Sequence, residues 1–371
     1  MNDVELLLLH ARLVATNSVS RDEGRAADLV AGTLKEHGIV PIRVGHNVAA
    51  SHGPEDAPVL HLCSHLDTVP ASAAWTRDPW TPSVESGRVY GLGSNDAKAS
   101  VAGMISAFLA LSAAGLPLRL VLALTAEEEV GGKGAETLLP ELKRRGLAAD
   151  AALIGEPTSL DLAVAQKGLM VCEIKTEGKS VHAAHARALG TPNPVRLLAR
   201  DLVAIEAVDL GADDPDLGPV TLEPTVLSGS AARNLVPAEA SCILDVRVNP
   251  TPPPEEIAAR LRALVRHGVL NVLSSRLRPQ STPTDAAVVR ACLAARPGAR
   301  TFGSRGVSDW CFYGGVPAVK VGPGATERSH TADEWIGIEE ITAGAAFYAA
   351  AARAFAALMR PSPRTAEESA R

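Results

Sequence analysis

The stretch VLHLCSHLDT, residues 59–68, is a short apolar run that ends in a cluster of polar side chains. Two further apolar runs follow it, at residues 118–125 and 151–154, and segments with helical periodicity, residues 97–114 and 133–145, separate the three. Continuous apolar strands that alternate with helices are typical of a parallel sheet covered on both faces. The first part of the chain is therefore predicted to be an α/β domain.

The pattern changes after residue 167. Strands and helices of a small α+β type follow, and the first pattern returns at about residue 282 with a helix, a strand and a long final helix. We therefore predict one α/β domain made of residues 1–167 and 282–371, interrupted by an inserted domain at residues 168–281. The polar tail, residues 361–371, is expected to be disordered.

Composition excludes several classes of protein. The 371 residues are 46% hydrophobic, which is enough for a large core, and the net charge of -6 argues against a nucleic-acid partner. The five cysteines lie far apart and form no Cys-x-x-Cys, so we expect no disulfide framework and no thiolate zinc site. The apolar runs are too short or too interrupted for a membrane span, and no secretory leader is recognisable. A reducing, cytoplasmic location is predicted.

Polar clusters stand where the predicted strands end, which is where open α/β sheets bind ligands. They lie at residues 65–67, 93–96, 127–129, 155–158 and 329–334. Each has an ordinary explanation when taken alone. His65 fits a surface or satisfied core histidine, the three glutamates a solvated helix start, and Asp96 a helix N-cap.

Together, the clusters are harder to explain without a cation. Many carboxylates packed at one rim would be strongly unfavourable unless a divalent metal neutralised them. Carboxylate and imidazole ligands without thiolates suit catalytic zinc, with cobalt or manganese as substitutes. The carboxylates outnumber what one zinc ion uses, which indicates two metal ions.

Five motifs, in this order, resemble those of the co-catalytic zinc peptidase/deacylase family. They are HLDTVP (65–70), GLGSNDAK (91–98), EEVG (128–131), GEPT (155–158) and HTADE (330–334). That family includes acetylornithine deacetylase, succinyl-diaminopimelate desuccinylase, carboxypeptidase G and related dipeptidases. The resemblance covers nearly the whole chain. It implies a mixed sheet flanked by helices, with a ferredoxin-like insertion that serves as lid and dimerisation domain.

The resemblance also implies a ligand set. Asp96, followed by a cis peptide, would bridge two zinc ions. His65 and Glu156 would complete one site, and Glu129 and His330 the other.

Glu128 would be the general base, and Asp67 would orient the preceding zinc-ligating histidine through its second ring nitrogen. The register of the three glutamates is set by Gly131, which makes Glu127 the equivalent of the family's usual aspartate. A slip by one position is the alternative.

The insertion supplies further candidates by resemblance. His182 would reach across a homodimer to hold the scissile carbonyl oxygen. The alternatives are a plain surface histidine and confusion with the nearby His185. Arg247 would bind a substrate carboxylate, or would instead form an interface salt bridge. The implied substrate contacts are Asn234, Arg247, Gly322 and Gly324.

The resemblance is greatest to acetylornithine deacetylase and its acetylcitrulline-cleaving relatives, so a small N-acyl amino acid is the expected substrate. Carrier-linked lysine or ornithine hydrolases come next, then desuccinylases and dipeptidases, with Arg305 and Arg328 as possible contacts for extra carboxylates. A non-catalytic metal-binding scaffold is the alternative from another class. A nucleotide-binding protein is disfavoured because residues 131–134 lack the spacing of a phosphate loop.

Overall fold

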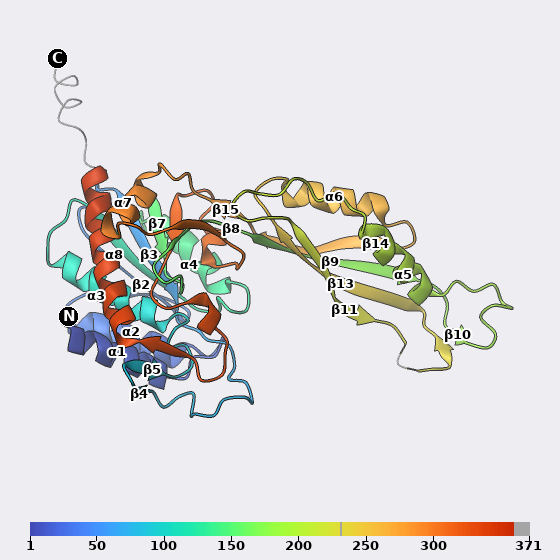
Figure 1. Ribbon diagram of the computed structural model, residues 1–371, viewed down its shortest axis with the longest axis horizontal. Coiled ribbons are helices and arrows are strands. Elements are labelled where there is room, and N and C mark those ends of the chain that lie inside the picture. Colours follow the sequence, from blue (N-terminus) through green and yellow to red (C-terminus); the bar gives the residue numbers. More distant parts are fainter. Residues whose placement is uncertain (231, 360–371) are drawn as a thin grey trace, which may run out of the picture. The chain divides into compact units, whose positions relative to one another are not determined.

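The structure is a computed structural model that describes residues 1–230 and 232–359; the polar tail predicted to be disordered lies outside them. The chain divides into two compact units (Figure 1). The first comprises Met1–Val164, Ser281–Phe302 and the chain from Ser308 on. The second comprises Ala165–Gln280 together with the short segment Gly303–Val307, which lies outside the predicted insertion.

The main sheet is mixed, and its strands lie in the order β1-β2-β6-β3-β7-β17-β8-β15, with β16 paired to β8. Its centre, β6, β3, β7 and β17, is parallel, whereas β1, β2 and β8 pair antiparallel. The bounds are β1 Ile42–Val44, β2 Asn47–His52, β3 Val59–His65, β6 Arg119–Thr125, β7 Ala151–Ile154, β8 Leu162–Gln166, β15 Gln280–Ser281, β16 Thr301–Ser304 and β17 Ala318–Lys320. The predicted parallel sheet is thus the middle of a mixed one.

Successive side chains of the central strands point alternately to the two faces of this sheet, and apolar residues lie on both. In β3, Leu60 and Leu62 join the core beneath one helical layer, while Val59 and Cys63 join a second core on the other face. The first layer contains α1 Asp3–Ala15, α2 Gly24–Glu36, α3 Lys98–Ser112, α7 Ala287–Ala295 and α8 Ile338–Leu358. The second contains α4 Lys133–Arg144 and the 3₁₀ turn η1 Asp309–Phe312. Both faces are therefore covered, as continuous apolar strands require.

The C-terminal helix α8 is long and apolar enough to cross a membrane by length and composition alone, which corrects the expectation that the apolar runs are too short or too interrupted to do so. It nevertheless buries Phe347, Tyr348 and Phe355 in the first unit, where it packs against α3 and α7. It is a core helix of this unit (Figure 1).

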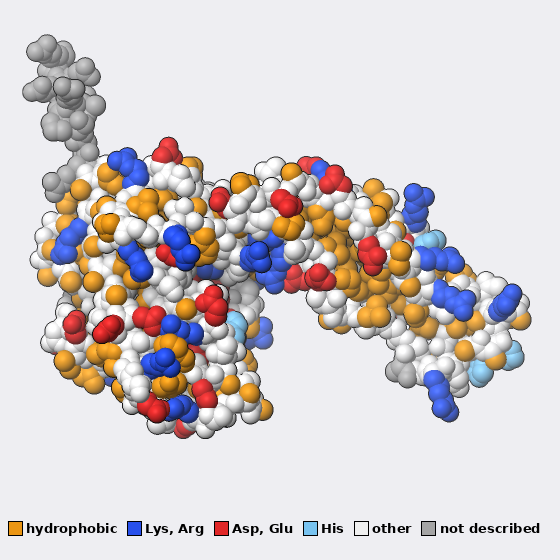
Figure 2. All heavy atoms as spheres, in the orientation of Figure 1, with side chains coloured by type: hydrophobic (Ala, Val, Ile, Leu, Met, Phe, Trp, Pro, Cys, Tyr) orange, Lys and Arg blue, Asp and Glu red, His pale blue; other side chains and the backbone are white. Residues whose placement is uncertain are grey.

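Two smaller features complete the first unit. Strands β4 Ser83–Glu85, β5 Arg88–Tyr90 and β18 Trp335–Gly337 form an antiparallel sheet in the order β18-β5-β4. The 3₁₀ turn η2 Thr326–Arg328 precedes His330. On the face of the first unit shown in Figure 2, Lys and Arg side chains are interspersed with Asp and Glu.

The second unit has the strand and helix order β9-α5-β11-β13-α6-β14 of a ferredoxin-like fold. Its antiparallel sheet runs β11-β13-β9-β14, and α5 and α6 pack on one face, over residues such as Met170, Cys172 and Ile174 of β9. The bounds are β9 Gly168–Glu177, α5 Pro194–Ile205, β11 Thr221–Ser228, β13 Glu239–Val248, α6 Pro254–Leu264 and β14 Val269–Leu277. A separate pair, β10 Val181–His182 and β12 Leu235–Val236, is also antiparallel.

Candidate metal centre

The five predicted metal ligands converge at one edge of the main sheet. His65 is the last residue of β3, Glu129 follows β6, and Glu156 follows β7, so three parallel strands deliver them to the same side. Asp96 stands just before α3, and His330 follows η2. The peptide bond between Asp96 and the next residue is cis, as the resemblance implied.

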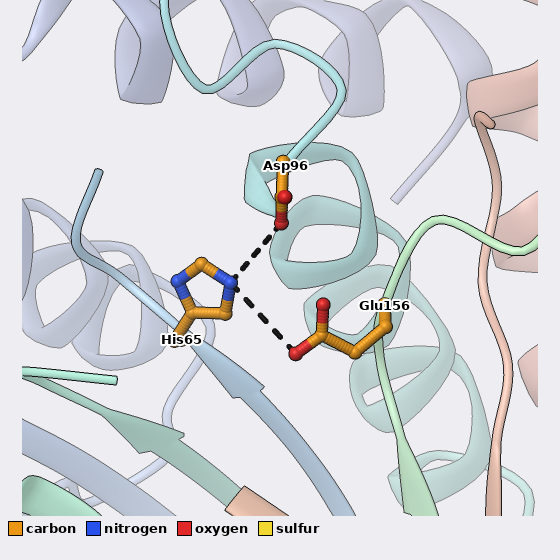
Figure 3. A group of neighbouring side chains, drawn as sticks. All are labelled: His65, Asp96 and Glu156. Atoms are coloured by element: carbon orange, nitrogen blue, oxygen red, sulfur yellow. Dashed lines mark hydrogen bonds and ion pairs between the residues drawn. The ribbon is translucent and has the colours of Figure 1, made fainter. Parts of the chain in front are cut away.

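The first triad consists of His65, Asp96 and Glu156, whose side chains point toward one another (Figure 3). The Nε2 atom of His65 lies 3.2 Å from Asp96 Oδ1 and 3.9 Å from Glu156 Oε1. One donor atom from each residue lies within 4.8 Å of the others. That spacing allows a single ion to contact all three.

The second triad shares Asp96 and adds Glu129 and His330. The Nε2 atom of His330 lies 2.9 Å from Glu129 Oε1 and 3.8 Å from the second carboxylate oxygen of Asp96, Oδ2. Asp96 therefore offers one oxygen to each triad. The His330 side chain is 50% exposed, whereas that of His65 is 2% exposed, so the second triad is the one open to solvent.

The electrostatics of the two triads fit a pair of cations. Burial raises the pKa of Glu156 to about 7, and burial with the neighbouring Glu156 raises the pKa of Glu128 well above its usual range. The hydrogen bond to Glu129 raises the pKa of His330 to about 9. Crowded carboxylates hold protons in this way when no positive charge offsets them. Imidazole nitrogens and carboxylate oxygens are also ligands that zinc accepts, so the residues fit two divalent ions.

Asp67 contacts His65 at its second ring nitrogen, the atom that the resemblance implied, and does so mainly through its main-chain carbonyl. The ring Nδ1 of His65 donates to the main-chain carbonyl of Asp67 at 3.0 Å, and the nearer carboxylate oxygen is 3.5 Å away. Because a carbonyl only accepts, Nδ1 carries the hydrogen and Nε2 is left to face Asp96. The Asp67 carboxylate instead accepts the backbone N–H groups of Glu128 and Glu129, each at 3.1 Å.

The three glutamates after β6 have distinct surroundings. Glu127 takes a left-handed backbone conformation, with φ of 56°, and its carboxylate lies 3.7 Å from Arg21. Glu128 is close enough to Glu156 for the charge of Glu156 to raise the Glu128 pKa, and Glu129 belongs to the second triad. This arrangement agrees with the register chosen on Gly131.

Sequence reasoning assigned no role to Glu334, although it lies in the last polar cluster. Its carboxylate is buried and accepts the backbone N–H groups of Gly93, Asn95 and Asp96 at 2.8–2.9 Å. Glu334 thus fixes the backbone that presents the shared ligand. Only the position of Glu334 within an acidic cluster could have indicated it.

The glycine loop after β17 packs closely behind the first triad. A Cβ atom at Gly322 would lie 2.5 Å from the carbonyl oxygen of Glu156, and one at Gly324 would lie 2.2 Å from Asn95 Oδ1. The backbone N–H of Gly322 donates to Thr158 Oγ1 at 3.2 Å. Gly322 therefore allows close approach to Glu156 and Gly324 allows close approach to Asn95, and their contact with substrate stays a prediction.

The remaining candidates belong to the second unit. His182 is exposed, and its Nδ1 accepts the backbone N–H of Ala184 at 3.2 Å. Asn234 lies beside it, because its carbonyl accepts the N–H of Ala183 at 2.8 Å. Arg247 pairs with Asp245 through two hydrogen bonds of 2.8 and 3.0 Å, which is a salt bridge within the strand. Their roles toward substrate stay predictions.

Comparison with known proteins identifies the family of this chain. A family model described as Peptidase family M20/M25/M40 matches residues 61–354. The chain belongs to this family. It is a metallo-hydrolase of the kind that the five motifs predicted. A succinyl-diaminopimelate desuccinylase of Stenotrophomonas maltophilia is 30% identical over 362 residues, covering 91% of this chain and 96% of the relative.

Solved structures of the same family share the fold. An aminopeptidase of Bacillus cereus superposes with a TM-score of 0.79 at 20% identity, covering 96% of this chain and 99% of the other. A dinuclear metal-binding peptidase of Bacillus subtilis gives a TM-score of 0.72 at 18% identity, covering 96% and 98%. The predicted mixed α/β fold is thereby confirmed.

Proposed function

We propose that the chain hydrolyses the amide bond of a small N-acyl amino acid with the help of two zinc ions, which cobalt can replace. The observation that carries this proposal is the pair of triads that share Asp96, with Glu128 directly before one of the ligands. His65 and Glu156 are the proposed partners of Asp96 on one side, and Glu129 and His330 on the other. A relative of the same fold is a dinuclear metal-binding peptidase, which supports two ions here as well.

The protein's own residues divide the work of the reaction. When bound, the metal pair supplies Lewis-acid chemistry, lowering the pKa of a water molecule and polarising the scissile carbonyl. Glu128 accepts the proton of the attacking water and delivers it to the leaving amine. Asp67 holds the ring of His65 through its carbonyl and holds the backbone of Glu128 through its carboxylate.

The substrate we propose first is N-acetylornithine or N-acetylcitrulline. Support comes from the resemblance of the Gly322–Gly324 loop and the His330 motif to deacetylases that act on these compounds. Arg328, one candidate for an extra carboxylate, is engaged elsewhere: it pairs with Glu340 at 2.6 Å and stacks on Trp335 at 3.8 Å. A carrier-linked lysine or ornithine is the next candidate on resemblance alone.

N-succinyl-diaminopimelate is a second candidate on independent grounds. Several curated relatives of about 30% identity, from Stenotrophomonas, Xanthomonas and Paracoccus, carry the name succinyl-diaminopimelate desuccinylase. A desuccinylase must bind more carboxylates than a deacetylase, and Arg305 is exposed. Replacing Arg305 by alanine should then raise the KM for the succinyl substrate and leave the KM for the acetyl substrate unchanged.

A substrate panel with and without chelator tests the proposal. The zinc-loaded protein is assayed on N-acetylornithine, N-acetylcitrulline, N-succinyl-diaminopimelate, a carrier-linked lysine and several dipeptides. We expect chelator-sensitive cleavage of one acylated amino acid, restored by added zinc. Cleavage of none, by protein that holds two metal ions per chain, would favour the scaffold alternative.

The second unit is proposed to be the lid and the dimerisation domain, with His182 acting on the scissile carbonyl of the partner chain. Its ferredoxin-like fold and the exposed position of His182 support this assignment. A donor aimed at a developing oxyanion is worth about 3–4 kcal/mol. The cytoplasmic location predicted from the free cysteines also stays a proposal.

A further inference from the structure

The loop that carries the proposed base is held by an unbroken series of side-chain acceptors. Four consecutive backbone N–H groups, from Ala126 to Glu129, each donate to an oxygen of a buried side chain. The acceptors in order are Asn47 Oδ1 at 2.9 Å, Glu23 Oε1 at 3.1 Å, Asp67 Oδ1 at 3.1 Å and Asp67 Oδ2 at 3.1 Å. Among the described residues, no backbone carbonyl accepts from these four groups, so the conformation of the loop depends on these three side chains.

Glu23 is the member of this series that comes from farthest away in the sequence. It precedes α2, more than a hundred residues before the loop, and its side chain is completely buried. Its Oε1 atom also accepts the N–H of Arg21 at 2.6 Å, and its Oε2 atom accepts from His46 Nδ1 at 2.9 Å. Together with the bond from Glu127, these hydrogen bonds fix the Glu23 carboxylate in one orientation. The His46 side chain is 45% exposed, so this series of hydrogen bonds ends at the protein surface.

Glu23 accepts the N–H group of Glu127, whose backbone conformation is unfavourable by itself. Glu127 has φ of 56°, a left-handed conformation that is unfavourable for a residue other than glycine. Its N–H bond to Glu23 stabilises this conformation, and the next peptide leads directly to Glu128. Asp67 fixes the N–H of Glu128 from the other side. The direction of the Glu128 side chain therefore follows from two buried carboxylates on different parts of the fold.

We infer that Glu23 is a positioning residue for the catalytic base, acting through the backbone of Glu127, and that His46 holds Glu23 in place. This inference rests on the proposed function, since it takes Glu128 as the base. A displacement of about 1 Å in a reacting group can cost about 100-fold in rate. The hydrogen bonds of Glu23 go to Arg21, His46 and Glu127, none of which belongs to a triad, so its loss is expected to lower kcat and to leave KM unchanged.

Two substitutions at Glu23 separate positioning from charge. Glu23→Gln keeps a carbonyl oxygen for the N–H groups of Arg21 and Glu127, and its amide can donate to the other tautomer of His46. It is expected to stay within about threefold of wild-type kcat, since both N–H groups keep their acceptor. Glu23→Ala removes the acceptor, and we expect kcat to fall about 10- to 100-fold, with KM within about twofold and two metal ions still bound.

A matched control measures what a merely structural loss would do. Asp201 in α5 is also buried, and its carboxylate also accepts consecutive N–H groups, those of Arg266, His267 and Gly268, at 2.7–3.1 Å. Asp201→Ala therefore removes a comparable acceptor from the second unit. It is expected to lower the unfolding midpoint as Glu23→Ala does, while leaving kcat per folded molecule within about twofold, since it touches no loop of the metal centre.

The decisive experiment combines Glu23→Ala with Glu128→Gln in the zinc-loaded protein. If Glu23 acts only through the base, Glu23→Ala has no further effect once Glu128 is replaced, so the two losses do not multiply. If they multiply, or if Glu23→Ala leaves kcat per folded molecule at the wild-type value, the inference is overturned. Near-normal turnover by Glu128→Gln alone overturns the proposed base itself, which is a distinct result.

His46→Ala provides the same test if Glu23→Ala does not fold. The half-exposed ring can be removed without a buried cavity, and kcat is expected to fall several-fold at unchanged KM. Unchanged kcat in folded His46→Ala would leave Glu23 with a structural role only and would also overturn the inference.

Discussion

Buried carboxylates have two different roles in this chain, and the roles are visible only in their contacts. Asp96 and its partners face one another across the two triads. Glu23, Asp67, Glu334 and Asp201 instead accept two or more backbone N–H groups each. The first kind gathers negative charge that a cation must offset, and the second stabilises irregular backbone. Glu23 and Asn47 could not be assigned from the sequence, because their partners lie about eighty to a hundred residues away.

The register of the three glutamates leads to a residue-level prediction. Glu128→Gln is expected to lower kcat by about 10²–10⁴-fold, the usual contribution of a general base, while both metal ions stay bound. Glu127→Gln is expected to have little effect, because that carboxylate faces Arg21 near the surface. Single-turnover rates and metal content of both variants provide the measurement. The reverse pattern would mean that the register is wrong by one residue.

His61 leads to a prediction about pH and stability. It is buried in β3, and its Nε2 donates to the carbonyl of Leu147 at 2.9 Å, so Nδ1 accepts from the hydroxyl of Tyr313 at 3.2 Å. Burial lowers the pKa of His61 to about 4, from about 6.5 when unfolded. The unfolded chain then binds the proton more tightly. The stability that neutral His61 provides is therefore present above pH 6.5 and is lost as the pH falls toward 4.

The size of this effect follows from the two pKa values. Two and a half pH units at about 1.4 kcal/mol each give about 3.5 kcal/mol for the complete loss. Urea unfolding of the metal-free protein at pH 7, 6 and 5 should show the loss, and His61→Gln should show a shallower dependence. Identical pH dependence in the two proteins would mean that His61 is protonated in the folded state.

At the scale of elements, the ends of the central strands could be predicted from the sequence. The loops that pack against the residues at those ends could not. The apolar runs and the polar residues after them placed His65, Glu129 and Glu156 at the ends of β3, β6 and β7 without any structure. The glycine loop after β17 was recognised by resemblance, but its tight packing against Glu156 was not. Close approach between two loops leaves no periodicity in a sequence.

This packing gives an element-level prediction. Gly322→Ala places a methyl group 2.5 Å from the carbonyl oxygen of Glu156 and 2.5 Å from Ser100 Oγ, so the loop or the ligand must move. We expect a loss of about 1–3 kcal/mol in the free energy of unfolding, with weaker metal binding. The matched control is Gly32→Ala in α2, where a Cβ meets nothing within 4 Å and helix propensity should raise stability. Equal metal affinity in Gly322→Ala and wild type would contradict the proposed contact.

For the whole molecule, the sequence pattern indicated an insertion of a different fold type, and the second unit has the order of a ferredoxin-like fold. The segment Gly303–Val307 was not predicted to join that unit, because five residues carry no fold signal of their own. The partner of Arg247 was also left open, and its bond to Asp245 depends on side-chain orientation along one strand.

The proposed dimer gives a prediction at this scale. If His182 acts on the partner's substrate, His182→Ala and Glu128→Gln are each nearly inactive as homodimers, yet mixing them restores part of the activity. The mixed dimer holds one site with both an intact base and an intact histidine. Activity of the mixture is compared with that of each variant alone, after subunit exchange. No recovery in a mixture shown to form mixed dimers would place His182 in its own chain's site or outside catalysis.

The central claim is a pair of metal ions that share Asp96, and counting bound zinc tests it most directly. The number of zinc ions per chain is measured after equilibration with zinc and removal of the excess, for wild type, His65→Ala and His330→Ala. We expect two ions for wild type and one for each variant, because each substitution removes a ligand from one triad only. One ion or none in wild type, or two ions in both variants, would contradict the claim.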